Sequence, residues 1–222
     1  MPIGELLSLG SAIIWGFSVS LFKIIGNTIS PYILNPLKNT IGTILFIITC
    51  IAVGNNPLLY ELNTNEYILV IVSGVIGITI ADVLFLLSLN ILGTSRSSII
   101  NTIYSPMVIL LAYFILGEQL QFIHIVGGGL IIGSIIFLSM DANQKTVENV
   151  TLGLVLGIIA YTLMALGIVI IKPILDKFSN SIDAQLWIIL YRLIPGTILS
   201  YVTMSIMLSR TEIKKQLSSK KI

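Results

Sequence analysis

The sequence predicts an all-α integral membrane protein, a polytopic bundle of about seven transmembrane helices. Of its 222 residues, 55% are hydrophobic and only 10% are charged, whereas a soluble domain carries roughly 25% charged residues. The apolar residues form long uninterrupted runs, while the strands of a membrane barrel would give short segments of alternating polarity. Because each span takes roughly 20 apolar residues, the chain has no room for a separate soluble domain.

Short polar or turn-forming stretches divide the chain into apolar runs, each long enough to cross a bilayer as a helix. The expected spans are residues 6–25, 32–53, 67–90, 97–116, 121–140, 151–172 and 184–208. The expected connections are residues 26–31, 54–66, 91–96, 117–119, 141–150 and 173–183. A lysine-rich tail follows from Ser209. We therefore expect a multi-pass protein of the cell membrane, with antiparallel neighbouring helices and the lipid bilayer as its surroundings.

Composition also argues against several classes of function. The net charge of +2 is too small to predict a nucleic-acid partner. Cys50 is the only cysteine and His124 the only histidine, so we expect no disulfide within the chain, no metal site and no cofactor. A membrane enzyme would need a nucleophile with a base, or a set of metal ligands, within the spans. No phosphate-binding GxxxxGK loop is present, which argues against direct use of ATP.

An internal repeat is visible in the apolar runs. Gly4–Lys23 brackets the first span as Gly153–Lys172 brackets the sixth, and Lys38–Leu45 recurs as Arg192–Leu199, with Gly-Thr-Ile-Leu at the end of both. The repeat unit would have five spans. Because five is odd, a second copy must enter the membrane from the opposite side, which is the inverted-repeat arrangement of many secondary transporters.

The repeat defines the expected domain organisation. Residues 1–140 form a first five-helix repeat, residues 151–208 form a partial second repeat of two helices, and residues 209–222 form a basic polar tail. Three further spans of the second copy are expected to be absent, which leaves open a homodimer or a missing second half as the partner. Membrane orientation also stays open, since the count of basic residues depends on the tail.

Four motifs in this order resemble the EamA-type members of the drug/metabolite transporter superfamily. They are Trp15-Gly16 in the first span, a cation at Lys38 and Arg192, Pro106 followed by Gly117-Glu118, and the glycines Gly127 to Gly129 with Gly133. The family usually has arginine where this chain has Lys38. The resemblance implies a two-repeat, ten-helix transporter with a central substrate cavity between the halves. It predicts a secondary transporter of a small metabolite or drug-like solute, working by alternating access; the alternative is a structural membrane subunit or an inactive truncated half-transporter.

Polar residues inside the spans are the candidates for the cavity. A charge near the centre of a bilayer costs at least roughly 2.5 kcal/mol, and Asp82 lies deep in the third span. It either binds a coupling proton or a substrate amine, or it has a structural role as the partner of Lys38 or in a hydrogen bond between packed helices. Lys38 and Arg192 either hold a carboxylate in the cavity or extend to the headgroups. Asn101, Tyr104 and Ser105 form a polar stripe, which either lines the cavity or forms hydrogen bonds to neighbouring helices.

The remaining candidates are a tryptophan, a proline, two pairs of glycines and a glutamate. Trp15 is expected to line the cavity on the strength of the resemblance, with packing as the alternative. Pro106 is a candidate hinge, because it frees a backbone carbonyl one turn earlier. Two pairs with small-xxx-small spacing are expected to let helices approach closely; they are Gly129 with Gly133, and Gly153 with Gly157. Glu118 is expected to cap the fifth helix.

Overall fold

The computed structural model describes residues 3–53, 62–139 and 149–218, and every regular element in these ranges is helical. The helices are α1 (Ile3–Gly26), α2 (Pro31–Val53), α3 (Thr64–Gly74), the π-helix η2 (Val75–Ile80), α4 (Ala81–Asn101), α5 (Tyr104–Leu116), α6 (Phe122–Ser139), α7 (Val150–Lys177), α8 (Ile182–Met207) and α9 (Arg210–Leu217). The predicted connections over 54–66 and 141–150 lie largely outside the described residues. The predicted all-α fold is confirmed.

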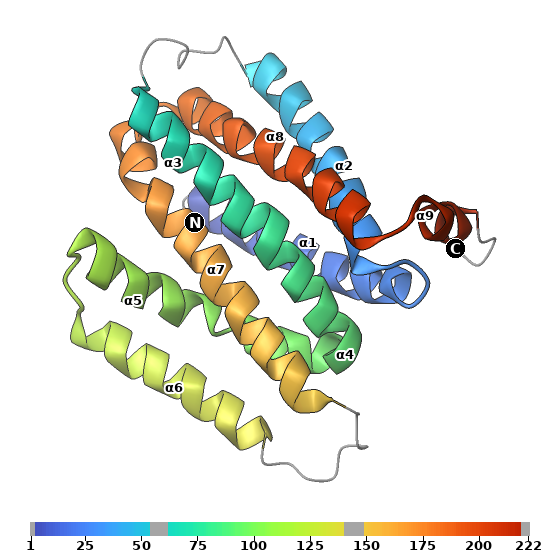
Figure 1. Cartoon of the computed structure of the whole chain (residues 1–222). Coiled ribbons are helices and arrows are strands. Elements are labelled where there is room, and N and C mark those ends of the chain that lie inside the picture. The colour runs from blue at the N-terminus through green and yellow to red at the C-terminus, as the bar shows by residue number, and fades with distance from the viewer. Residues whose placement is uncertain (1–2, 54–61, 140–148, 219–222) are drawn as a thin grey trace.

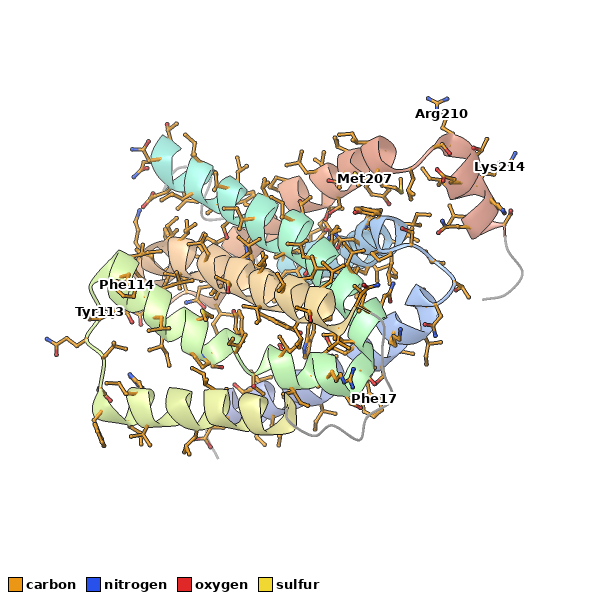
Figure 2. All side chains as sticks on the ribbon, turned by 60° about the horizontal axis from the view of Figure 1, so that its bottom comes forward. Phe17, Tyr113, Phe114, Met207, Arg210 and Lys214 are labelled. Atoms are coloured by element: carbon orange, nitrogen blue, oxygen red, sulfur yellow. The ribbon has the colours of Figure 1, made fainter. Side chains whose placement is uncertain are left out.

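Five helical stretches of the described chain are long and apolar enough to cross a membrane, and two shorter apolar helices accompany them. The five are Gly4–Gly26, Pro31–Val53, Thr64–Asn101, Val150–Lys177 and Ile182–Met207; the shorter two are Tyr104–Leu116 and Phe122–Gly133. Large apolar side chains face outward over the bundle, as a lipid-embedded surface requires. Phe17, Phe114 and Met207, labelled in Figure 2, are 71%, 75% and 51% exposed.

Helix α7 is the centre of the bundle (Figure 1). It packs against α4, α5, α3 and η2, while α8 packs against α2, α3 and η2. Helix α1 contacts α4 and α2, and α6 packs against α5 at the edge of the bundle. Two clusters of buried side chains hold these layers together, one around Phe85 and Tyr161 and the other around Val70, Ile171 and Ile188.

A single glycine separates the third and fourth predicted spans. Gly93 has φ 79° and ψ 174°, a backbone conformation open essentially to glycine alone. The chain is helical on both sides of it. The predicted six-residue connection over 91–96 is therefore wrong in length, because glycine turns the chain within one residue and lets both helices run up to the turn.

The fourth span is interrupted, so the prediction of one continuous helix over 97–116 is wrong. Helix α4 ends at Asn101 and α5 begins at Tyr104. Pro106 carries no N–H to bond the carbonyl of Thr102, and the Thr102 N–H itself bonds the carbonyl of Ile99, 3.1 Å away, in a tighter turn. The break therefore lies one turn ahead of the proline, as expected of a proline inside an apolar span.

The sixth span is longer than predicted, because Pro173 lies inside α7 and does not end it. The proline removes one backbone hydrogen bond. On either side of it, Ile171 and Ile174 are 0% and 3% exposed, and their burial against α3 and α8 keeps the helix intact to Lys177. The predicted connection over 173–183 is correspondingly too long.

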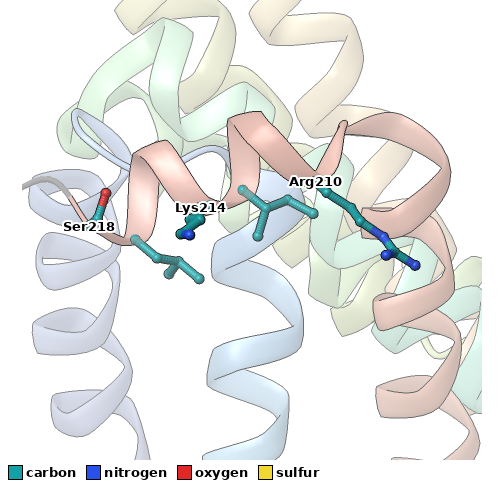
Figure 3. A pocket seen from close by; sticks show the side chains of 5 residues that line it. Arg210, Lys214 and Ser218 are labelled. Carbon is teal, nitrogen blue, oxygen red and sulfur yellow. The ribbon is translucent and has the colours of Figure 1, made fainter.

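The basic tail contains a helix that the prediction of a polar tail did not foresee. Ser209 and Glu212 form a capping box at the start of α9, and the Ser-x-x-Glu spacing in the sequence is its signature. Ile213 packs against the core, and the Gln216 side chain accepts a hydrogen bond from the Ser30 N–H at 2.8 Å. Figure 3 shows Arg210 and Lys214 along this helix, which runs across the end of the bundle.

Candidate functional site

A cavity of about 1450 Å³ lies between α1, η2, α4, α5, α7 and α8. Its polar lining residues are Ser8, Ser11, Asn101, Tyr104, Ser105, Tyr161, Gln185 and Arg192, and its apolar ones are Leu7, Ala12, Trp15, Gly77, Ile78, Met164 and Ile189. The structure thus brings Trp15, Asn101, Tyr104 and Arg192 of the predicted set to one cavity. Lys38 and Asp82 are not among the residues that line it.

An aromatic cluster forms one wall of the cavity. Trp15 of α1 stacks on Phe85 of α4 with ring centroids 5.8 Å apart, and Phe85 in turn contacts Tyr161 of α7 at 5.9 Å. Phe85 is 1% exposed, so it fixes the two lining rings from behind. A rigid wall of this kind presents apolar surface to a solute at little cost in side-chain entropy.

The Arg192 guanidinium is placed by two glycines. A Cβ at Gly77 of η2 would lie 2.5 Å from Arg192 Nη2, and a Cβ at Gly167 of α7 would lie 3.1 Å from the same atom. Any side chain at Gly77 would therefore displace the guanidinium. Within the described residues, the buried Nε of Arg192 has no hydrogen-bond partner. Sequence reasoning found the arginine but not the two glycines that make room for it.

Lys38 and Asp82 bind each other. Lys38 Nζ lies 2.5 Å from Asp82 Oδ2 and also donates to Asn39 Oδ1 at 2.8 Å. Both side chains are largely buried, 18% and 14% exposed. This geometry corresponds to the structural alternative for Asp82; its role in binding a coupling proton stays a prediction.

A buried polar cluster beside this ion pair was missed in the sequence. Asn35 and Asn39 of α2 donate to the carbonyl of Ile78 in η2, at 3.2 and 3.4 Å, and both contact Ser200 Oγ of α8. Asn35 also donates to the carbonyl of Thr79. A π-helix often occurs at functional sites, and here side-chain amides from α2 bond the carbonyls it presents. The i, i+4 pair of asparagines in an apolar span was the available signal.

The glycines of α7 lie at close helix contacts. A Cβ at Gly153 would lie 2.7 Å from Leu92 Cγ, and one at Gly157 would lie 2.7 Å from Ser88 Oγ. Ser88 donates to the carbonyl of Gly153 at 2.7 Å. These contacts join the N-terminal part of α7 closely to α4.

The predicted hinge and capping residues lie around α5 and α6. A Cβ at Gly129 or Gly133 would meet nothing within 4 Å among the described residues. Pro106 and Gly129 instead line a smaller pocket of about 300 Å³ between α5 and α6. Glu118 forms an ion pair with Lys172 of α7, and its role in capping α6 stays a prediction.

Comparison with known proteins gives one family. Residues 2–140 match the EamA-like transporter family. No curated protein and no solved structure matches the chain. Within the described residues, no three His, Cys, Asp or Glu side chains come together as a metal site would need.

Proposed function

Because the chain belongs to the EamA-like transporter family, we propose that it is a secondary transporter of the cell membrane. Membership of this family makes it a multi-pass membrane transporter of the drug/metabolite type for a small-molecule substrate. A small metabolite or drug-like solute binds in the cavity between α1, η2, α4, α5, α7 and α8. The cavity opens alternately to the two sides of the membrane.

The observation that carries this proposal is the composition of the cavity wall. Trp15, Asn101 and Tyr104 come from the proposed first repeat, residues 1–140, while Gln185 and Arg192 come from the proposed partial second repeat. Transporters built from inverted repeats place their substrate site at the interface between the repeats. A cavity lined from both sides of such an interface can change its access when one part rocks against the other.

The pairing of α2 with α8 supports the inverted relation of the repeats. Thr43 and Thr197 occupy the same place in the repeated Gly-Thr-Ile-Leu motif, and their hydroxyls lie 2.9 Å apart. Equivalent residues touch each other where they lie near a two-fold axis. The Thr40–Tyr201 contact at 2.9 Å lies on the same seam. From one contact to the other, the residue number rises on α2 and falls on α8. The two helices are therefore antiparallel, as inversion requires.

Alternating access can be tested with a single cysteine in the cavity. Cys50 is buried, and a Cys50→Ser background removes it. Ser11→Cys then places a thiol on the lining of α1. We expect a membrane-impermeant methanethiosulfonate reagent to modify this thiol from either side of the membrane, in intact cells and in inverted vesicles.

The matched control lies on the same helix. Phe17 is 71% exposed and faces outward, so Phe17→Cys should react slowly from both sides because lipid covers it. Modification of the thiol in Ser11→Cys from one side only, under all conditions, would contradict alternating access and favour a structural subunit or an inactive half-transporter.

A further inference from the structure

The cavity contains one charged side chain among the described residues that line it. Arg192 contributes a guanidinium, and the other lining residues are uncharged. A guanidinium has five N–H donors and stays protonated at any physiological pH. Because a charge within a membrane span is costly without a partner, an unpaired arginine facing a cavity marks the position where a negative group can bind.

The carboxylate of Asp82, which interacts electrostatically with Arg192, is already engaged by another side chain. Asp82 Oδ2 lies 2.5 Å from Lys38 Nζ. Lys38 and Asp82 together carry no net charge. The positive charge of Arg192 is therefore not neutralised by a direct ion pair, and the described lining of the cavity carries a net positive charge.

We infer that the cavity selects small organic monoanions, whose carboxylate, sulfonate or phosphonate oxygens bind the Arg192 guanidinium; this inference rests on the proposed transport function. A guanidinium held in place donates two parallel N–H hydrogen bonds, one to each of two anionic oxygens. Gly77 and Gly167 leave the space that the guanidinium occupies. The uncharged part of the solute then lies against Trp15 and Tyr161.

The same geometry disfavours cationic solutes. A cation would need a carboxylate on the lining or an open aromatic box, and the described lining provides no carboxylate. Asn101 and Gln185 add neutral groups that donate and accept hydrogen bonds. They suit the polar substituents of an anion without adding an opposing charge.

The charge selectivity of the cavity can be measured without knowing the natural solute. Trp15 lines the cavity, and Trp187 is the second of two tryptophans. A Trp187→Phe protein, purified in nanodiscs of neutral lipid with a tryptophan-free scaffold protein, therefore reports quenching at Trp15 alone. Iodide, caesium and acrylamide serve as the anionic, cationic and neutral quenchers at constant ionic strength.

We expect the ratio of the iodide to the caesium quenching constant to fall several-fold in Arg192→Gln. Arg192→Lys should retain most of the ratio, because it keeps the charge. Acrylamide quenching should be equal in all three proteins, which shows that the cavity keeps its shape. An unchanged ratio in Arg192→Gln, with acrylamide quenching also unchanged, overturns the inference.

Two permanently charged solutes extend the test to organic ligands. Benzenesulfonate should protect Trp15 from iodide, while benzyltrimethylammonium of similar size should not, and Arg192→Gln should abolish the difference. Equal protection by both solutes counts against anion selectivity. The cysteine labelling from two sides is independent of this outcome, so failure of the anion site and failure of alternating access are separately visible.

Discussion

Two helix contacts in the bundle use glycine in opposite ways. One joins α3 and η2 to α8, and the other joins α5 to α6. A Cβ at Gly196 of α8 would lie 2.8 Å from Ile78 Cβ and 3.0 Å from the carbonyl oxygen of Gly74. On α6, Cβ atoms at Gly129 and Gly133 would meet nothing within 4 Å among the described residues. Glycine content alone therefore does not indicate a close helix contact.

The two regions also differ in polarity. Beside η2, buried Asn35, Asn39 and Ser200 join α2, η2 and α8 through directional hydrogen bonds. On α6, Phe122 and Leu130 are 80% and 71% exposed, and the surface is suited to lipid. In a membrane, helices associate through close van der Waals contact and interhelical hydrogen bonds instead of the hydrophobic effect. The first region has both kinds of contact, so it should carry the stability of the fold.

The largest expected effect comes from adding a side chain at the close contact between α3 and α8. Gly74→Leu should remove more than about 3 kcal/mol of stability, because overpacking forces the backbones of α3 and α8 apart. A Cβ at Gly74 already meets the carbonyl of Arg192. Gly129→Leu on α6 is the matched control and should leave the melting temperature unchanged or slightly higher, since leucine is the better helix former.

Thermal unfolding followed by size-exclusion chromatography in detergent measures both variants. Equal melting temperatures for the two variants would contradict the division between a tight and a loose region.

This difference marks the limit of sequence reasoning. The apolar runs predicted an all-α membrane fold, because run length and polarity are local properties. The partner of each residue is not local: Gly129 and Gly153 have the same spacing motif, yet only Gly153 lies against another helix. Arg192 was a cavity candidate because of its depth in the span, whereas Trp15 was a candidate only through the resemblance to the family. The sequence left open whether Asp82 pairs with Lys38 or binds a proton or solute, because neither segment by itself determines the register between α2 and α4.

A second, smaller effect concerns the ion pair between Lys38 of α2 and Asp82 of α4. Asp82→Asn leaves the Lys38 ammonium without its partner, so we expect a loss of about 2 kcal/mol, less than for a fully buried pair. The double variant Lys38→Met with Asp82→Asn should recover most of this loss, because it removes both charges. Melting temperatures of the four proteins give the coupling energy, and simple additivity would count against a structural pair.

The same double variant separates the structural role from proton coupling. If Asp82 binds a coupling proton, solute uptake into proteoliposomes should stop responding to a pH gradient in the double variant although its stability is restored. A normal response to the gradient in a stable double variant would refute the proton-binding role of Asp82.

The smallest expected effect is at α9, which contacts the end of the bundle through Ile213 and Gln216. Glu212 accepts hydrogen bonds from the Ser209 hydroxyl at 2.7 Å and from the Ser209 N–H at 2.8 Å, and these bonds hold the pKa of its carboxyl below the usual value. A carboxyl whose pKa is lower in the folded state stabilises that state above its unfolded pKa. The contribution is lost as the pH falls through the folded pKa.

Hydrogen exchange, corrected for the intrinsic pH dependence of amide exchange, should therefore show weaker protection of α9 at pH 3 than at pH 7. Glu212→Gln is the matched control, because glutamine keeps the capping box but does not titrate. Its protection should be nearly equal at the two pH values. Equal pH dependence in both proteins would mean that α9 depends on its packing through Ile213 and Gln216, and not on the charged cap.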